Sequence, residues 1–337
     1  MAVSSGDIIT AAQYNGLQSR INQVLGVGSS GFGYGQAVSS SQVLSITDPN
    51  IPDGDSITAA QFNNLRSDMR KAFIHQNGTE IPINSFNVGD IIGADASGTD
   101  VNSDTGAIIN PDATKGFNDL LDVMSGLEAD RFNIAIGQAE TQVRAADERT
   151  TNWNGTITSE FTVSFSNADA RRHFFNAGGR IEISGSVLNI PSDDSFARNE
   201  GWQSLLSIPG TILFDHNSTT ITGQNTSNVS FPSGSIGNSD LTSSYQTIFR
   251  KDASNGVYSD SFWRIDARQN STSQIQFRVV LVDDGPESDS DAGQPGAIPG
   301  GIVEPITADI EFEYAARRAN GEVVLPFPTF NITNTFE

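Results

Sequence analysis

The spacing of apolar residues predicts two amphipathic helices near the N-terminus. Between residues 10 and 25, large apolar side chains recur every three or four positions, so they share one face of a helix. The same spacing returns between residues 58 and 73. The first apolar stripe is Tyr14, Leu17, Ile21, Val24 and Leu25, and the second is Phe62, Leu65, Met69, Ala72 and Phe73.

Both stripes follow the same motif, which indicates an internal duplication. The segment GDIITAAQYNGL at residues 6–17 returns as GDSITAAQFNNL at residues 54–65. Thr10 and Thr58 stand where a helix N-cap is expected, because a threonine hydroxyl accepts a hydrogen bond from an exposed amide of the first turn. A divergent third copy at residues 113–120 leads into further apolar residues at helical spacing, Leu121, Met124, Leu127 and Phe132.

Short helices with an apolar face need a packing partner. Two helices of about four turns cannot bury such stripes alone, so they pack on each other, on the rest of the chain, or on another protein. Packing within the chain and docking on a neighbour are both open at this point. The docking hypothesis assigns partner contacts to Tyr14, Leu17, Ile21, Val24, Phe62, Leu65 and Met69.

From about Trp153 onward, the helical spacing gives way to short runs of alternating apolar and polar residues, the period of a half-buried β-strand. Turn-forming residues separate these runs. The polar segment 166–173, which leads through residues 174–177 into a turn at Gly178 and Gly179, is expected to form a short helix. The predicted strands are 156–158, 161–165, 180–187, 210–214, 245–249, 262–268, 274–282 and 306–314. Such a set is typical of an antiparallel β-sandwich or jelly-roll-like domain.

Together these patterns predict an α+β chain with three regions. Residues 1–80 form a tandem helical repeat region with a docking role, and residues 81–150 form a linker with the divergent third helical repeat. Residues 151–337 form an antiparallel β-sandwich domain. Stretches rich in Gly and Ser, at residues 26–41 and 93–106, are expected to be loops.

The charge and the cysteine content narrow the classes of partner and chemistry. The chain has 19 Lys and Arg residues against 40 Asp and Glu residues, and its net charge of −21 repels nucleic acid and anionic membrane surfaces. No apolar run approaches the length of a membrane span. We therefore expect no nucleic-acid partner and no membrane association. The absence of cysteine excludes zinc–thiolate sites and cysteine nucleophiles.

No residue pattern in the sequence points to catalysis. Residues 26–31 fit the spacing G-x-G-x-x-G, but they follow a predicted helix rather than a strand, so we interpret them as a loop. The acidic segment 283–291 lacks the ligand spacing of a calcium-binding EF-hand. Trp202 and Trp263 are expected to fill the β core. The histidines, which show no metal-ligand spacing, are His75, His173 and His216. We assign no catalytic, cofactor-binding or metal-binding residue.

Several segments together carry a resemblance to a known family. They are the repeated ITAAQ-aromatic-Asn motif, residues 116–132, HFFNAGGRI at 173–181, WQSLL at 202–206 and PFPTFNI at 326–332. With these segments, nearly the whole chain resembles a family of virion structural proteins from tailed bacteriophages, of the cyanophage type found in the tail, neck or fibre. The motifs are structural, and the family carries no catalytic residues to transfer.

The resemblance implies a non-enzymatic structural component of a phage virion, in the tail, neck or fibre apparatus. It would be assembled in the host cytoplasm and docked on other virion proteins through the N-terminal helical repeats. Phage appendages are usually symmetric, so we expect a homo-oligomer and favour a trimer. Two alternatives stay open: a glycan-binding receptor-recognition protein that contacts a host surface glycan, and a capsid decoration protein.

Overall fold

The structure is a computed structural model that describes residues 9–28, 31–40, 57–88, 92, 116–135, 139–190, 197–253, 260–284 and 306–336. The chain divides into two compact units, and neither is a continuous stretch. Unit 1 comprises Met1–Glu140, Arg172–Gly178 and Ala319–Leu325, and unit 2 comprises Thr141–Arg171, Gly179–Arg318 and Pro326–Glu337. Helices form the body of unit 1 and two antiparallel sheets form most of unit 2, so the chain is α+β, as predicted.

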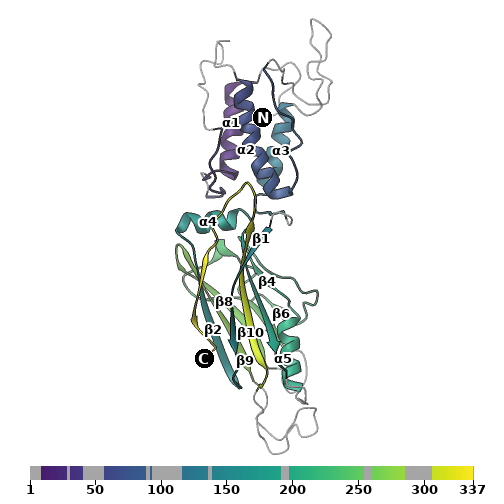
Figure 1. The fold of residues 1–337 in the computed structure, drawn as a ribbon, viewed down its shortest axis with the longest axis vertical. Coiled ribbons are helices and arrows are strands. Elements are labelled where there is room, and N and C mark those ends of the chain that lie inside the picture. The colour runs from purple at the N-terminus through teal and green to yellow at the C-terminus, as the bar shows by residue number, and fades with distance from the viewer. Residues whose placement is uncertain are drawn as a thin grey trace, which may run out of the picture. The chain divides into compact units, whose positions relative to one another are not determined.

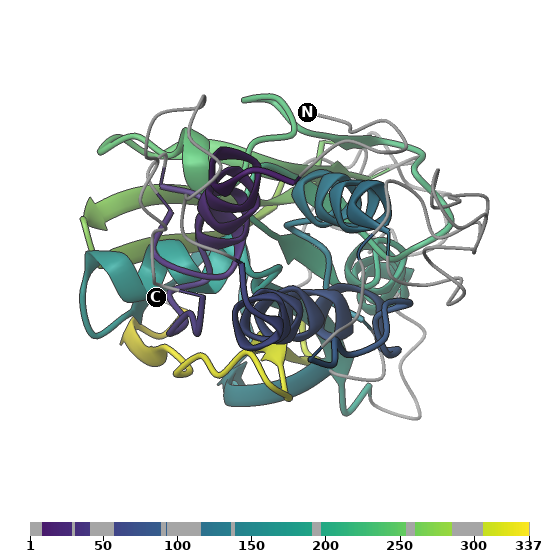
Figure 2. The ribbon, with the colours of Figure 1, turned by 90° about the horizontal axis from the view of Figure 1, so that it is seen from above.

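Three helices make up the body of unit 1 in the part of the chain that the structure describes (Figure 1). They are α1 (Ala11–Val24), α2 (Ala59–Asn77) and α3 (Phe117–Ala129). Each helix contacts the other two, and the end-on view in Figure 2 shows them at the corners of a triangle. A capping box begins both α1 and α2: the hydroxyl of Thr10 or Thr58 accepts a hydrogen bond from the backbone of Gln13 or Gln61, and that glutamine's side chain accepts one from the threonine backbone.

Helices α1 and α2 lie side by side with their N-terminal ends together. The ring of Tyr14 meets the ring of Phe62 edge-on, with 5.5 Å between the centroids. The Tyr14 hydroxyl donates a hydrogen bond of 2.9 Å to the carbonyl oxygen of Gln61. Tyr14 and Phe62 hold the same position in the two copies of the motif, so equivalent aromatic residues are in contact.

Segments from later in the chain complete the core of unit 1. Ala177 follows α4 (Ala168–Asn176), and Val323 and Leu325 follow β10 (Asp309–Ala319). All three are buried in the same apolar cluster as the stripes of the helices. The core of the helical unit therefore includes residues far beyond its last helix.

Unit 2 is built from two antiparallel sheets. The five-stranded sheet has the order β1-β10-β3-β4-β5, and the six-stranded sheet has the order β11-β2-β9-β8-β7-β6. Beside β10, the strands are β1 (Ala139–Arg149), β2 (Gly155–Ser164), β3 (Arg180–Leu188), β4 (Ile212–Phe214), β5 (Thr219–Ile221), β6 (Val229–Ser230), β7 (Gln246–Asp252), β8 (Phe262–Ser271), β9 (Gln274–Asp283) and β11 (Thr329–Asn334). Buried and half-exposed residues alternate along much of β2, β3 and β9, which places one apolar face of each sheet inward.

Aromatic stacking and a buried polar cluster join the two sheets. Phe161 on β2 stacks on Tyr314 of β10, with 3.8 Å between the ring centroids. The Tyr314 hydroxyl lies 3.1 Å from the hydroxyl of Ser159, which donates a hydrogen bond to the Asp147 carboxylate. Burial raises the pKa of both Asp147 and Tyr314. These contacts connect β1, β2 and β10 and hold the two sheets face to face.

The strands predicted from alternation correspond to β2, β3, β4, β7, β8, β9 and β10, and the predicted short helix corresponds to α4. The structure adds β1, β5, β6, β11 and the helix α5 (Ala197–Ser207). Strand β1 lies within the residues that the sequence analysis assigned to a linker. Trp202 and Trp263 are both buried, as predicted, and the Trp263 ring nitrogen donates to the carbonyl oxygen of Leu205 on α5 at 3.0 Å.

Replacing Leu325 with alanine should destabilise the helical unit by about 3 kcal/mol, because it leaves a cavity in a packed core. Leu325 is 3% exposed, whereas its neighbour Val324 is 67% exposed, so Val324→Ala is a matched control expected to stay within about 0.5 kcal/mol. Urea unfolding followed by far-ultraviolet circular dichroism measures the change. Equal losses in the two variants would contradict the packing of Leu325 into this core.

Candidate functional site

The residues assigned to partner docking lie in the core of unit 1. Each of them is at most 3% exposed. They are Tyr14, Leu17, Ile21, Val24, Phe62, Leu65 and Met69. The docking hypothesis for these side chains is therefore wrong, because a side chain enclosed in the chain's own core is not available to a partner. These side chains instead pack within the chain, which is the alternative that the sequence left open.

A buried carboxylate on α2 holds the segment that follows α1. Asp68 is 0% exposed. Its oxygens accept hydrogen bonds from the Ser39 backbone at 2.9 Å, the Ser40 backbone at 2.8 Å and the Ser40 hydroxyl at 2.7 Å. Sequence reasoning missed this role, although a signal was present: Asp68 lies three positions after Leu65, on the buried stripe, where an acidic residue needs a partner.

The glycine-rich segment after α1 is a loop, as interpreted from the sequence, and its described residues pack tightly. A side chain at Gly33 would place its Cβ 2.0 Å from the carbonyl oxygen of Gly26, and Gly28 has a φ of 70°. The Asn176 side chain donates to the carbonyl oxygens of Gly31 at 2.6 Å and Gly33 at 3.2 Å. Gly28 and Gly33 therefore let the loop fold closely on itself, and Asn176 attaches the loop to residues 172–178.

A buried polar cluster lies at the end of α2. The Nε2 atom of His75 is 2.8 Å from the carbonyl oxygen of Ala177. The Gln76 side chain donates to the Tyr34 hydroxyl at 2.7 Å, and that hydroxyl donates to the carbonyl oxygen of Arg131 at 2.5 Å. Burial lowers the pKa of His75 to about 4, so the imidazole is neutral near pH 7. At 3% exposure it cannot contact a substrate from solution.

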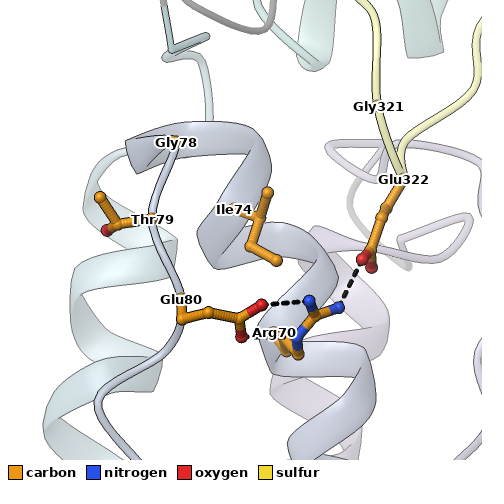
Figure 3. Close-up of a pocket in the computed structure, with 7 residues that line it drawn as sticks. All are labelled: Arg70, Ile74, Gly78, Thr79, Glu80, Gly321 and Glu322. Atoms are coloured by element: carbon orange, nitrogen blue, oxygen red, sulfur yellow. Dashed lines mark hydrogen bonds and ion pairs between the residues drawn. The ribbon is translucent and has the colours of Figure 1, made fainter.

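An open pocket of about 450 Å³ surrounds Arg70 on α2 (Figure 3). The Arg70 Nε atom donates to Glu80 at 2.6 Å, and the other guanidinium nitrogens pair with Glu80 and Glu322. The Arg70 guanidinium holds the pKa of the Glu80 carboxyl below its usual value. Because two carboxylates already pair with Arg70, none of the described residues that line the pocket offers a free cation for an anionic ligand. Exposed ion pairs of this kind contribute little to stability.

A second hollow, of about 320 Å³, lies at the start of α2. It is lined by Ile57, Thr58, Ala59, Phe62, Phe86, Asn87, Val88 and Ile92. Val88 is 98% exposed, which leaves an apolar side chain in solvent at its rim. The Asn63 side chain holds Phe86, one of the lining residues, in place. It donates a hydrogen bond to the Phe86 carbonyl oxygen and accepts one from the Phe86 amide, both at 2.8 Å. The hollow can take up apolar groups, and none of the described residues that line it has a titratable side chain.

The histidine and acidic side chains considered in the sequence form no metal-binding cluster in the described residues. Those residues contain no group of three or more His, Asp or Glu side chains that could hold a metal ion. Helices long and apolar enough to cross a bilayer are likewise absent from the described ranges. His75 and His173 belong to unit 1 and His216 belongs to unit 2, and the described histidines form no metal-binding group of three. Residues 285–291 of the acidic segment lie outside the described residues.

Comparisons with known proteins give no relative for this chain. No protein-family model, no curated protein and no solved structure matches it.

Replacing Asp68 with alanine should destabilise the helical unit by about 3 kcal/mol, because the backbone amides of Ser39 and Ser40 lose a charged acceptor. Asp122→Ala on α3 removes an exposed carboxylate and should change stability by less than about 0.5 kcal/mol. Urea unfolding followed by circular dichroism measures both. Hydrogen exchange should also show faster exchange of the Ser40 amide in Asp68→Ala. Unchanged protection of that amide would contradict the role of Asp68.

Proposed function

We propose that the chain is a non-enzymatic structural protein of a tailed-phage virion, in the tail, neck or fibre apparatus. The observation that carries this proposal is the duplicated ITAAQ-aromatic-Asn motif, which resembles phage virion proteins and here begins two matched helices, α1 and α2. In this proposal the N-terminal helices are tandem repeats, and the sheets of unit 2 form a sandwich or jelly-roll-like body. The protein is assembled in the host cytoplasm and becomes part of the virion.

The buried polar groups favour a structural role over catalysis. Asp68 fixes a loop, His75 contacts a backbone carbonyl, and Asp147 lies in a hydrogen-bonded cluster between the sheets. None of these three lines either of the two hollows described above. These three polar groups are therefore enclosed in the fold, where they specify packing.

We assign docking on neighbouring virion proteins to the surface of unit 1 rather than to its core stripes. Among the described residues, the large hydrophobic side chains that are exposed are Val27, Val88 and Val324, and all three belong to unit 1. Exposed apolar side chains beside an apolar hollow, as at Val88, are features that protein interfaces use. The net charge of −21 disfavours nucleic acid as the partner.

A homo-oligomer, with a trimer favoured, stays part of the proposal because virion appendages are symmetric. The apolar stripes no longer support it, since unit 1 buries them within a single chain. Glycan recognition has less support than a structural role. Trp202 and Trp263, which could have stacked on a sugar ring, are 3% and 0% exposed.

Gold-coupled antibodies against the purified chain should label intact particles of the phage that encodes it, at one defined position. Mass spectrometry of purified particles should detect the chain in repeated copies. A chain that is found in the infected-cell lysate but not in purified particles would overturn the virion assignment.

Replacing Val88 with glutamate should lower incorporation into particles by roughly tenfold, because a buried charge in an apolar contact costs at least one factor of ten in affinity. The side chain is 98% exposed, so the fold of the free protein should not change. Thr220→Glu adds the same charge at an exposed position of unit 2 and serves as the control. Normal incorporation of the Val88 variant would place the docking surface elsewhere.

A further inference from the structure

His75 makes one hydrogen bond and leaves its second ring nitrogen without a partner inside the core. Its Nε2 atom lies 2.8 Å from the carbonyl oxygen of Ala177, and a carbonyl oxygen can only accept, so Nε2 carries the proton. The other ring nitrogen, Nδ1, is therefore the unprotonated one. It is buried and has no hydrogen-bond partner. The ring packs 4.9 Å from the ring of Tyr34.

The surroundings of His75 stabilise the neutral imidazole relative to the protonated one. A proton added at Nδ1 would create a buried cation with an unsatisfied N–H group, which is costly in an apolar core. The charged or titratable groups on the segments beside His75 are Tyr34, Asp130 and Arg131 after α3, and Arg172 and His173 on the returning segment. The helix α2 itself carries Arg66, Asp68, Arg70 and Lys71, and α3 carries Asp119, Asp122 and Glu128. Burial raises the pKa of Tyr34, so this residue stays neutral and cannot balance the charge.

The carbonyl that His75 binds belongs to residues 172–178, the first segment that returns to unit 1. This segment is also held by other contacts, among them a hydrogen bond of 2.9 Å from the Arg172 guanidinium to the carbonyl oxygen of Val27. Asn176 binds the glycine-rich loop, and Gly178 packs so closely that a Cβ there would lie 2.5 Å from the carbonyl oxygen of Phe132. These attachments are short-range and depend on close approach of the backbone. The His75 contact holds the segment at Ala177, where it enters the apolar core of unit 1.

We propose that His75 is an acid-sensitive contact: it holds residues 172–178 on the helices near neutral pH, and its protonation releases them. The proton goes to Nδ1, and the resulting imidazolium is stable only where water reaches it, which requires the segment to open. This inference does not depend on the virion proposal, because it concerns contacts within unit 1.

The expected pH range follows from the two states of the imidazole. In the opened form the pKa returns to its ordinary value near 6.5, whereas in the closed form burial holds the pKa at about 4. The opened form therefore binds the proton first as the pH falls, and stability that is present above pH 6.5 is lost between about 6.5 and 4. The opening equilibrium rises tenfold per pH unit in this range, so pH 5.0 should favour opening by about 30-fold relative to pH 7.5.

Hydrogen exchange on the full chain at pH 7.5 and 5.0, corrected for intrinsic exchange rates, tests this directly. The amides to follow are those of Ala177 and Gly178, which donate to His173 and Phe175 at 3.0 and 3.1 Å. Wild-type protein should lose about 30-fold protection at these amides. His75→Gln keeps a side-chain donor but cannot be protonated, so its protection should change less than about twofold. His216→Gln in unit 2 should behave like the wild type.

Two results would overturn the proposal. One is equal protection of the Ala177 and Gly178 amides at both pH values in the wild type, and the other is the same acid sensitivity in His75→Gln. Should His75→Gln fail to fold, nuclear magnetic resonance titration of the wild-type imidazole decides the question. A His75 that titrates near pH 6.5 while residues 172–178 stay protected would show that its protonation does not open the segment.

Discussion

The structure of unit 1 depends on the closure of a helical core by residues that come much later in the chain. Helices α1, α2 and α3 end by Ala129, yet Ala177, Val323 and Leu325 belong to the same buried cluster. Each buried aliphatic side chain of the size of leucine contributes about 2 kcal/mol, a large share of the net stability of a small domain. Contacts between residues so far apart in sequence also tend to slow folding, because a long loop must close before they form. The helical unit is thus complete only when the chain has passed through most of unit 2.

Polar side chains set the details of this packing. Asp68 binds two successive backbone amides, Asn63 binds both backbone groups of Phe86, and Asn176 binds two carbonyls of the glycine-rich loop. Each of these contacts attaches an irregular segment to a helix, where backbone groups would otherwise be buried without partners. In unit 2, the Ser159 hydroxyl contacts Asp147 and Tyr314 between the two sheets. These buried polar groups therefore specify how segments of the chain meet.

Much of the local structure could be predicted from the sequence because it rests on local physics. Thr10 and Thr58 were expected to cap helices, and both do so with a capping box. The alternating runs became strands, and the Trp263 ring was expected in the core, where it lies. The prediction that failed was that the apolar stripes of the first two helices contact another protein. Tyr14 and Phe62 pack on each other within the chain. An apolar stripe shows that a helix face is covered, but it does not show which surface covers it. The short run at Val323 and Leu325 carries no signal of its destination, because apolar residues at alternate positions can face the core of either unit.

The dependence of the helical unit on returning segments is tested most directly by comparing residues 1–140 alone with the full chain. Urea unfolding of each, followed by far-ultraviolet circular dichroism, reports the stability of α1, α2 and α3. Without Ala177, Val323 and Leu325, the isolated segment should unfold over a broad range with little cooperativity, because its core is open on one side. A cooperative transition of residues 1–140 at the urea concentration at which the helices unfold in the full chain would contradict this account.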